Sequence, residues 1–410
     1  GQTQLVFCAI CHPLFPLVRQ VPPGQVVPAA LALGGLLSYL HETQKSDLSY
    51  ISDLEYYEQG RFMELDLSAR RNLELTETLR GKEKRGSLLW VLDKTKTAMG
   101  ARCLRAWLER PLREVAAITR RSNAVGALVN DTVAREEMRL ALSGISDMER
   151  LIGRIVYGTA GGRDLVSLRN SIEQLRAVRV QLARFTAGRL GELAGELDPL
   201  EDVAARIAET LVDEPPFSVR EGGFIRKGFH AEVDRLHDIL SGGKGLLASI
   251  ETQEKERTGI RTLKIGYNKV FGYYIEVSNS FKDQVPDTYI RKQTLVNGER
   301  YITQELKDLE QDILTAGERV NALEYELFSA LRDEVCANAE RIQRTAAAVA
   351  ELDALVSLAD VAGKNNYCCP VVDESGVIEI HDGRHPVVER VLKDALFVPN
   401  DTYMGEKENR

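Results

Sequence analysis

The sequence has 410 residues, 44% of them hydrophobic and 28% charged, and its 61 acidic and 53 basic side chains give a net charge of −8. This composition excludes a disordered polyelectrolyte and a membrane bundle, and the length predicts about two to four domains. Six scattered cysteines are too few for a disulfide framework, which favours a reducing, intracellular environment. The acidic total argues against a histone-like protein, but a nucleic-acid binder with a local basic patch stays open.

The first segment, residues 1–48, is rich in proline and apolar residues, and we expect one short helix in it, at 29–40. No basic stretch with a small-residue cleavage site opens the chain, and the proline-free part of its longest uncharged stretch is too short to cross a bilayer. The chain starts with glycine rather than methionine and stops on a polar stretch, residues 405–410. We therefore expect that both ends are cut.

Residues 49–230 predict a multi-helix domain. Apolar residues recur at helical spacing through 88–108, 140–155 and 165–178. A short strand pair is expected around 56–65, where apolar and polar residues alternate. This part of the chain therefore favours a mainly α fold.

Two longer helices are predicted beyond this domain, at 231–258 and 303–345. In both, apolar residues come close to a heptad repeat, and in the second they form a seam with alternating steps of three and four. At a rise of 1.5 Å per residue the second helix would be about 60 Å long, more than a compact core requires. The seam residues are Leu306, Leu309, Ile313, Ala316, Val320, Leu323, Leu327 and Ala330.

Between the two long helices, residues 259–302 change to the alternation that is typical of β-strands. Strands are expected at 262–267 and 273–277, with a third at 289–295. A small sheet at the end of two long helices would make an arm with a tip. The alternative is a helical hairpin whose β decoration only packs against a neighbour.

The expected tip is basic although the chain is acidic. Between residues 255 and 307 there are ten basic and six acidic side chains, so this stretch carries +4 and the remainder carries −12. Basic side chains combined with amides and a hydroxyl are the groups that hold phosphate oxygens. Asn297 and Gly298, placed before an expected helix start, would add backbone N–H groups for an anion. An ordinary solvated surface is the alternative interpretation.

Motifs for metal or catalytic chemistry are incomplete. Cys8, Cys11 and His12 form half of a zinc motif, while Cys368 and Cys369 are adjacent and badly spaced to share one ion. No Gly-x-x-x-x-Gly-Lys-Ser/Thr phosphate loop occurs in the sequence. We therefore expect no metal site, no cofactor site and no catalytic residues in this chain.

Several segments, taken together and in order, resemble one known family. Over about residues 29–410 the chain resembles the MutS family of bacterial DNA mismatch repair proteins, from the end of the connector domain to the start of the ATPase domain. Residues 1–28 depart from the family's connector pattern. The matching segments are D-L-S-A-R-R-N-L-E-L at 66–75, L-D-K-T-K-T-A-M-G-A-R at 92–102, L-R-A-W-L at 104–108, K-I-G-Y-N-K-V-F-G-Y-Y-I at 264–275, R-K-Q-T-L-V-N-G-E-R-Y at 291–301, E-L-D-A-L at 351–355 and G-R-H-P-V-V-E at 383–389.

The resemblance implies a mainly α fold with a multi-helix core, two long antiparallel lever helices and a small β-sheet clamp at their tip. The family's mismatch-reading domain and its phosphate loop would fall outside the chain. The implied division is a connector remnant (1–48), the first part of the core (49–230), a lever helix (231–258), the clamp (259–302), the second lever helix (303–345), the rest of the core (346–372) and the start of the ATPase domain (373–410).

In that family two clamps of a dimer close over double-stranded DNA through contacts to its backbone. The resemblance therefore implies duplex DNA as the partner, a homodimer and a downstream mismatch repair protein for the full-length form, and no membrane. ATP and Mg²⁺ belong to the full-length family, so we expect no cofactor and no enzymatic activity in this chain, and a location in the bacterial cytoplasm at the nucleoid. The residues implied to contact the DNA backbone are Asn268, Lys269, Gln293, Thr294, Asn297 and Arg300, together with Arg291 and Lys292, which strand alternation points to opposite faces.

Two other functions stay open at this point. A coiled-coil scaffold protein would use the same tip to bind another protein rather than DNA. A related branch of the superfamily acts in recombination or on stalled ribosomes, although the complete clamp signature favours mismatch repair.

Overall fold

The structure, a computed structural model, describes residues 14, 26–44, 62–217, 222–268, 272–392 and 397–405. The described part is mainly α-helical, as the sequence predicts, and it contains two small antiparallel sheets. The chain divides into two compact units, one of Gly1–Ala160, Ser167–Ala204 and Val335–Arg410 and the other of Gly161–Val166 and Ala205–Glu334. Within the described residues, no helix is both long and apolar enough to cross a membrane.

The first unit is built around α15 (Ala339–Asn365), which packs against α5, α6, α7, α8, α9 and α11. Alanine, leucine and valine occupy most sides of α15, so the helix is buried along much of its length. Ser87, Thr97, Asp131 and Asp147 each cap a surrounding helix by accepting a hydrogen bond from a backbone N–H of its first turn. The other helices with residues in this unit are α3 (Val26–Gln44), α4 (Leu67–Asn72), α5 (Leu88–Leu92), α6 (Ala98–Glu109), α7 (Val115–Asn130), α8 (Thr132–Leu142), α9 (Met148–Val156), α10 (Gly162–Leu182), α11 (Gly188–Glu196), α12 (Glu201–Thr210) and α16 (Pro386–Val391).

The last part of the first unit contains two short strands on either side of α16. β5 (Ile378–Gly383) and β6 (Asn400–Met404) pair antiparallel, and most of their side chains are exposed. α16 starts with Pro386, because the first position of a helix needs no backbone N–H. Arg384, two residues before this helix, and Arg390 within it lie close to the end of α15, in surroundings described further below.

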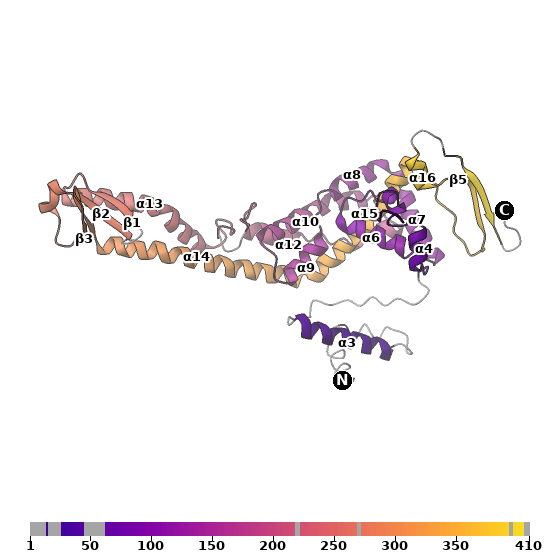
Figure 1. Ribbon diagram of the computed structural model, residues 1–410, viewed down its shortest axis with the longest axis horizontal. Coiled ribbons are helices and arrows are strands. Elements are labelled where there is room, and N and C mark those ends of the chain that lie inside the picture. The colour runs from indigo at the N-terminus through magenta and orange to yellow at the C-terminus, as the bar shows by residue number, and fades with distance from the viewer. Residues whose placement is uncertain are drawn as a thin grey trace. The chain divides into compact units, whose positions relative to one another are not determined.

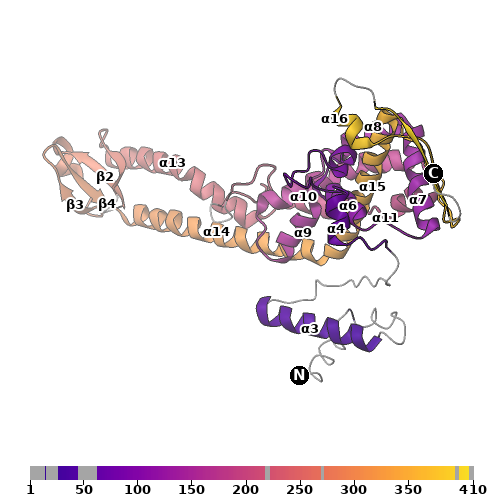
Figure 2. The same ribbon diagram turned by 45° about the vertical axis from the view of Figure 1, so that its right-hand side comes forward.

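The second unit is formed mainly by two long helices and a four-stranded sheet. α13 (Ala231–Thr258) and α14 (Gln304–Ala337) run side by side, and the sheet lies where α13 ends and α14 begins (Figures 1 and 2). Gly259 ends α13 with a φ of 70°, a left-handed conformation that glycine adopts without strain. The strands are β1 (Lys264–Asn268), β2 (Gly272–Ser278), β3 (Ile290–Thr294) and β4 (Gly298–Ile302), in the order β1-β2-β4-β3 with all neighbours antiparallel, and a 3₁₀ helix, η1 (Asn279–Gln284), follows β2.

Two local predictions agree closely with the structure, and one lies partly outside it. α13 has the bounds predicted for the first long helix, and α3 contains the short helix expected at 29–40. Of the strand pair expected around 56–65, residues 56–61 lie outside the described residues. Within the described part, Phe62 forms only an isolated bridge with Leu112.

The second long helix is shorter than the sequence predicts. The helix predicted to run through 345 is interrupted at Asn338, which has φ −96° and ψ 12°, so α14 ends one residue before it and α15 begins one residue after it. The N–H of Asn338 donates to the carbonyl of Val335 (3.0 Å) in a tighter turn. Asparagine is a poor residue for a helix interior because its side chain competes for backbone hydrogen bonds. Apolar residues keep their helical spacing across Asn338, so the sequence pattern predicts one continuous helix.

The buried seam of α14 follows the prediction only at first. Leu306, Ala316 and Val320 are buried, whereas Ala330 is exposed. A straight helix has 3.6 residues per turn, so its buried face drifts away from a strict heptad over several turns. The side chains of Leu309 and Ile313 lie outside the described part. Farther along, the buried residues are Glu324, Phe328, Leu331 and Val335.

The fourth strand replaces the helix start that was expected after Gly298. Gly298–Ile302 pairs with both β2 and β3, so Asn297 and Gly298 lead into a strand, and the expected anion site at a helix N-terminus is wrong. A Cβ at Gly298 would lie 2.6 Å from the carbonyl oxygen of Val277, which is why glycine stands where the two strands come together. Glu299 is acidic but is buried on the inner side of this strand. The strand therefore lacks the alternation of apolar and polar residues by which a strand is predicted from sequence.

Candidate nucleic-acid interface

The inner face of the four-stranded sheet is an apolar core that fastens it to the two long helices. Ile275 and Val277 of β2 and Tyr301 of β4 are almost completely buried, together with Ile250 of α13 and Leu306 of α14. Alternation along each strand sends the intervening residues to the opposite face. The sheet is therefore held rigidly at the helix ends while its outer face stays available to solvent.

A buried polar group joins the sheet to α13. Glu254 is 7% exposed, and its carboxylate accepts hydrogen bonds from the hydroxyl of Tyr289 and from Nη2 of Arg257 (2.7 Å). Burial alone would raise the pKa of Glu254, but the hydrogen bonds from Arg257 and Tyr289 outweigh it and hold this pKa below its ordinary value. One turn earlier, Oε2 of Glu251 accepts from the backbone N–H of Ile265 in β1 (3.0 Å). Glu251 therefore fixes the first strand to α13, and Glu254 fixes Tyr289, the residue before β3, to the same helix.

A polar row crosses the outer face of the sheet. In this row Gln293 of β3 lies opposite Arg300 of β4, Arg300 lies opposite Glu276 of β2, and Glu276 lies opposite Lys264 of β1. Arg300 donates from Nε to Glu276 (3.0 Å) and from Nη1 to Gln293 (3.0 Å). Its guanidinium also stacks 4.3 Å from the centre of the Tyr274 ring. Arg300 therefore binds three strands together, and its side chain is only 20% exposed.

The Tyr274 ring, on which the Arg300 guanidinium stacks, extends over β1. A Cβ at Gly266 would lie 2.7 Å from the hydroxyl oxygen and Cζ of Tyr274, so only glycine leaves room for the ring there. Gly266 lies directly opposite Tyr274 in the register of the two strands. The outer face thus has a packed centre, formed by one aromatic ring between a glycine and an arginine.

A second ionic group lies on the inner side, around Glu299. Its carboxylate is within 3.2 Å of Nζ of Lys282 and 3.3 Å of Nη1 of Arg291, and it accepts the hydroxyl hydrogen bond of Tyr301. The hydrogen bond from Tyr301 and the nearby Lys282 hold the pKa of Glu299 below its ordinary value, while burial and Glu299 raise the pKa of Tyr301 to about 12. The register shift between Arg291 and Gln293 marks a bulge that sends Arg291 to the same side as Glu299.

Four cations of the sheet region are exposed and have no ion pair among the described residues. They come from the turn before β1, from β1 and β3, and from the first turns of α14. Lys264 is the last residue of the outer row, and strand alternation places its side chain on the outer face of the sheet. Unpaired, exposed cations are the ones that can neutralise phosphates without first breaking a contact of their own. These residues are Arg261, Lys264, Lys292 and Lys307.

The eight residues predicted as DNA contacts fall into different environments. Gln293 and Arg300 are brought together and bonded to each other, and Arg291 is engaged with Glu299. Lys292 is exposed and unpaired. Lys269 lies outside the described residues. The other three are Asn268 at the end of β1, opposite Gly272, and the exposed Thr294 and Asn297 at the turn between β3 and β4.

Arg261, Lys264 and Lys307 contribute to the basic excess of residues 255–307 but are not among the residues that the resemblance implies as DNA contacts. All three are exposed. Lys264 could have been found, because it has the same strand parity as Gly266 and therefore faces away from the apolar core. The ion pair of Arg300 with Glu276 could not have been predicted, because these residues are 24 positions apart and only the strand register brings them together.

No group of three or more metal-binding side chains that could hold an ion occurs within the described residues. The half-motif at Cys8, Cys11 and His12 lies outside them. Cys368 and Cys369 are both exposed and are free thiols.

Comparison with known proteins gives the class that this architecture belongs to. Residues 68–359, well over half of the chain, match the family model MutS domain III. The chain is 52% identical over 382 residues to the DNA mismatch repair protein MutS of Symbiobacterium thermophilum, 48% over 379 residues to that of Lachnoclostridium phytofermentans and 44% over 376 residues to that of Listeria monocytogenes serotype 4b. These matches cover 92–93% of this chain and 41–44% of each relative, so the chain spans less than half the length of the curated relatives it matches.

A helical unit and a unit of paired long helices that end in a small sheet are the parts that the resemblance implied. With the match to domain III and the identity of about half to these relatives, the chain belongs to the MutS family.

Proposed function

We propose that this chain is the core and clamp part of a DNA mismatch repair protein and that its four-stranded sheet binds the backbone of duplex DNA. The observation that carries the proposal is the set of exposed, unpaired cations Arg261, Lys264, Lys292 and Lys307 around a sheet in an otherwise acidic chain. The names of the relatives support the same function.

The chemistry of these groups favours contacts to phosphates rather than to bases. Lysine and arginine side chains on strands and turns present point charges, whereas base readout in the major groove usually employs a helix or ribbon that inserts several side chains. Asn268, Thr294 and Asn297 would add neutral hydrogen bonds to phosphate oxygens, and the predicted contact of Lys269 would add one more charge. Such an interface binds duplexes of any sequence about equally well.

For Arg300 and Gln293 we propose a positioning role in this interface. Because Arg300 is bonded to Glu276 and Gln293 and stacked on Tyr274, a phosphate could reach it only where the guanidinium edge is exposed. Its main contribution would be to hold β2, β3 and β4 in register so that the neighbouring lysines face the same way.

The remaining features of the whole protein belong to this proposal as well. The full-length form would be a homodimer that closes two clamps over DNA, would bind and hydrolyse ATP with Mg²⁺ and would pass the signal to a downstream repair protein. The chain described by this sequence would bind duplex DNA without a cofactor or nucleotide hydrolysis of its own, in the cytoplasm.

Fluorescence anisotropy of an end-labelled duplex of about 20 base pairs tests the proposal. The double variant Lys264→Gln/Lys292→Gln should bind roughly tenfold more weakly or worse, and by the same factor for duplexes of different sequence. The matched control Lys227→Gln/Arg150→Gln removes the same charge from two exposed residues away from the sheet and should bind as the parent chain does. Equal loss in both double variants would overturn the assignment to the sheet, and a chain that binds no duplex at low salt would favour the scaffold alternative.

A further inference from the structure

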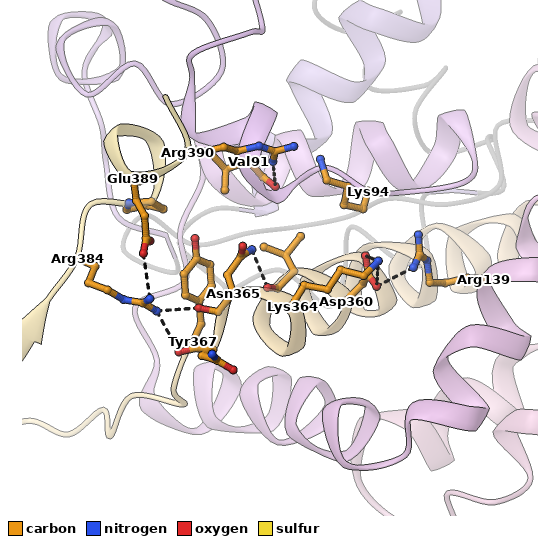
Figure 3. Close-up of a pocket in the computed structure, with 13 residues that line it drawn as sticks. Val91, Lys94, Arg139, Asp360, Lys364, Asn365, Tyr367, Arg384, Glu389 and Arg390 are labelled. Atoms are coloured by element: carbon orange, nitrogen blue, oxygen red, sulfur yellow. Dashed lines mark hydrogen bonds and ion pairs between the residues drawn. The ribbon is translucent and has the colours of Figure 1, made fainter. Parts of the chain in front are cut away.

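A second basic feature, unrelated to the sheet, lies in the first unit. A cavity of about 540 Å³ is formed where the end of α15 meets the end of α5, α8 and α16 (Figure 3). Volumes of this size are typical of sites for small molecules. In Figure 3, Arg390, Val91 and Lys94 lie along one side of this basic pocket, and Asn365, Lys364 and Asp360 lie along the other.

The basic pocket has more positive charge than its own carboxylates neutralise. Five of its lining residues are basic and two are acidic. Asp360, which is 1% exposed, is shared by Arg139 (2.6 Å) and Lys364 (2.8 Å). Glu389 pairs with Arg384 (3.0 Å). Both carboxylates of the basic pocket are therefore already engaged in ion pairs with Arg139, Lys364 and Arg384.

Two of the basic residues have hydrogen bonds only to backbone carbonyls within the described part of the chain. Nζ of Lys94 is 3.4 Å from the carbonyl oxygen of Trp90 and 3.3 Å from that of Asp93, and Nη1 of Arg390 is 3.3 Å from that of Val91. Within the described part of the chain, neither Lys94 nor Arg390 has an ion pair with a carboxylate. These long contacts leave most of the donor capacity of both side chains unused.

The electrostatics of the basic pocket favour an anionic ligand. Burial lowers the pKa of Lys94, and the positive charge of Arg390 lowers it further. On the opposite side, Nε of Arg139 is buried and has no hydrogen-bond partner among the described residues. Holding like charges together in a half-buried cavity is unfavourable unless an anion joins them.

We propose that the basic pocket binds a small phosphorylated molecule, with its phosphate groups between Lys94 and Arg390. Charge-assisted hydrogen bonds from arginine and lysine are the strong contacts of phosphate sites, and arginine offers two parallel donors. The volume exceeds that of a single phosphate and accommodates a diphosphate or a nucleotide, and the lining also contains Tyr367, over whose ring the guanidinium of Arg384 lies. The concave shape favours a small molecule over the backbone of a duplex.

Trp90 supplies a direct readout, because the guanidinium of Arg390 stacks 4.4 Å from the centre of its ring. The sequence has two tryptophans, so the variant Trp107→Phe leaves Trp90 as the single reporter. Inorganic pyrophosphate titrated at constant ionic strength should change the fluorescence of Trp90 and saturate. Absence of a saturable change below about 10 mM pyrophosphate would overturn the proposal.

Variants then locate the site. In the Trp107→Phe background, Lys94→Gln and Arg390→Gln should each weaken pyrophosphate binding by about tenfold or more, whereas Arg390→Lys should recover part of the loss. The matched control Arg105→Gln removes one charge from an exposed pair on α6 and should leave the affinity unchanged. Because Arg390→Gln also alters the stacking on Trp90, calorimetry provides the affinity for that variant. An equal loss in Arg105→Gln would contradict the proposal.

A competition experiment separates a small molecule from nucleic acid as the source of phosphate. Pyrophosphate should bind to the same extent with and without a saturating duplex of about 20 base pairs. Displacement of pyrophosphate by the duplex would assign the phosphates of this pocket to nucleic acid and would overturn the small-molecule proposal. The clamp proposal is unaffected by either outcome, because Lys94 and Arg390 lie in the other unit.

Discussion

A Cβ atom on Gly100 in α6 would lie 2.3 Å from Oδ2 of Asp353 in α15. The Asp353 carboxylate occupies this place because it accepts hydrogen bonds from the backbone N–H groups of Lys96 (2.9 Å) and Thr97 (2.7 Å) and from the Thr97 hydroxyl (2.7 Å). Thr97 in turn caps α6 by accepting the N–H of Gly100 (2.9 Å). A buried carboxylate thus fixes the start of a helix more than 250 residues away in the sequence.

The close approach predicts that Gly100→Ala destabilises the chain. The added methyl group would also meet Cβ and Cγ of Asp353 at 2.7 Å, so a simple rotation of the carboxylate does not relieve it. We expect a loss of about 1–3 kcal/mol in the free energy of unfolding, measured by urea denaturation. Gly126→Ala in α7 is the control, because a Cβ there meets nothing within 4 Å, and it should stabilise by about 0.5–1 kcal/mol. The account is contradicted if both variants shift in the same direction.

The Glu254 group predicts a particular dependence of stability on pH. The pKa of Glu254 is lowered in the folded chain, so its contribution is complete above the unfolded value of about 4.3 and disappears as the pH falls through the lower folded value. Glu254→Gln should therefore lower the free energy of unfolding at neutral pH by about 1–3 kcal/mol, with the difference from the parent shrinking at acid pH. Chemical denaturation of both proteins between neutral pH and pH of about 3 measures it. A difference that stays constant over this range would show that Glu254 is not the titrating group.

Variants of Arg300 and Lys264 should distinguish a residue that positions the sheet from a residue that contacts phosphate. Arg300→Gln removes the bridge between Glu276 and Gln293 and should destabilise the second unit by about 1–3 kcal/mol. Its duplex affinity should fall, but the slope of log K against log salt should stay near that of the parent. Lys264→Gln, in contrast, should reduce this slope by about 0.9 with little change in stability. If Arg300→Gln reduces the slope as Lys264→Gln does, Arg300 contacts a phosphate directly.

The regular parts of this fold could be predicted from local sequence patterns. The bounds of α13 follow from its apolar spacing and from Gly259, whose left-handed conformation ends the helix. The strand β4 could not be found in the same way, because Glu299 on its inner side is neutralised by Lys282 and Arg291 and is buried against the usual pattern. A charged residue can be buried only when partners neutralise it, and the partners of Glu299 are distant from it in the sequence.

The same limit applies to the candidate site. Composition shows that residues 255–307 are basic, and the resemblance marks the residues that the family uses there. Which cations are available is decided by ion pairs between strands, and these pairs engage Arg291 and Arg300 while they leave Lys264 and Lys292 unpaired. Strand register, rather than residue type, therefore separates the residues that build the sheet from those that face a ligand.

The salt dependence of duplex binding tests the central proposal most directly. If the sheet neutralises about four phosphates, the logarithm of the association constant should fall linearly with the logarithm of the salt concentration, with a slope of about −3.6. The slope should be the same for duplexes of different sequence, because only the backbone is contacted. A slope near zero, or a slope unchanged when both Lys264 and Lys292 are replaced by glutamine, would contradict the account.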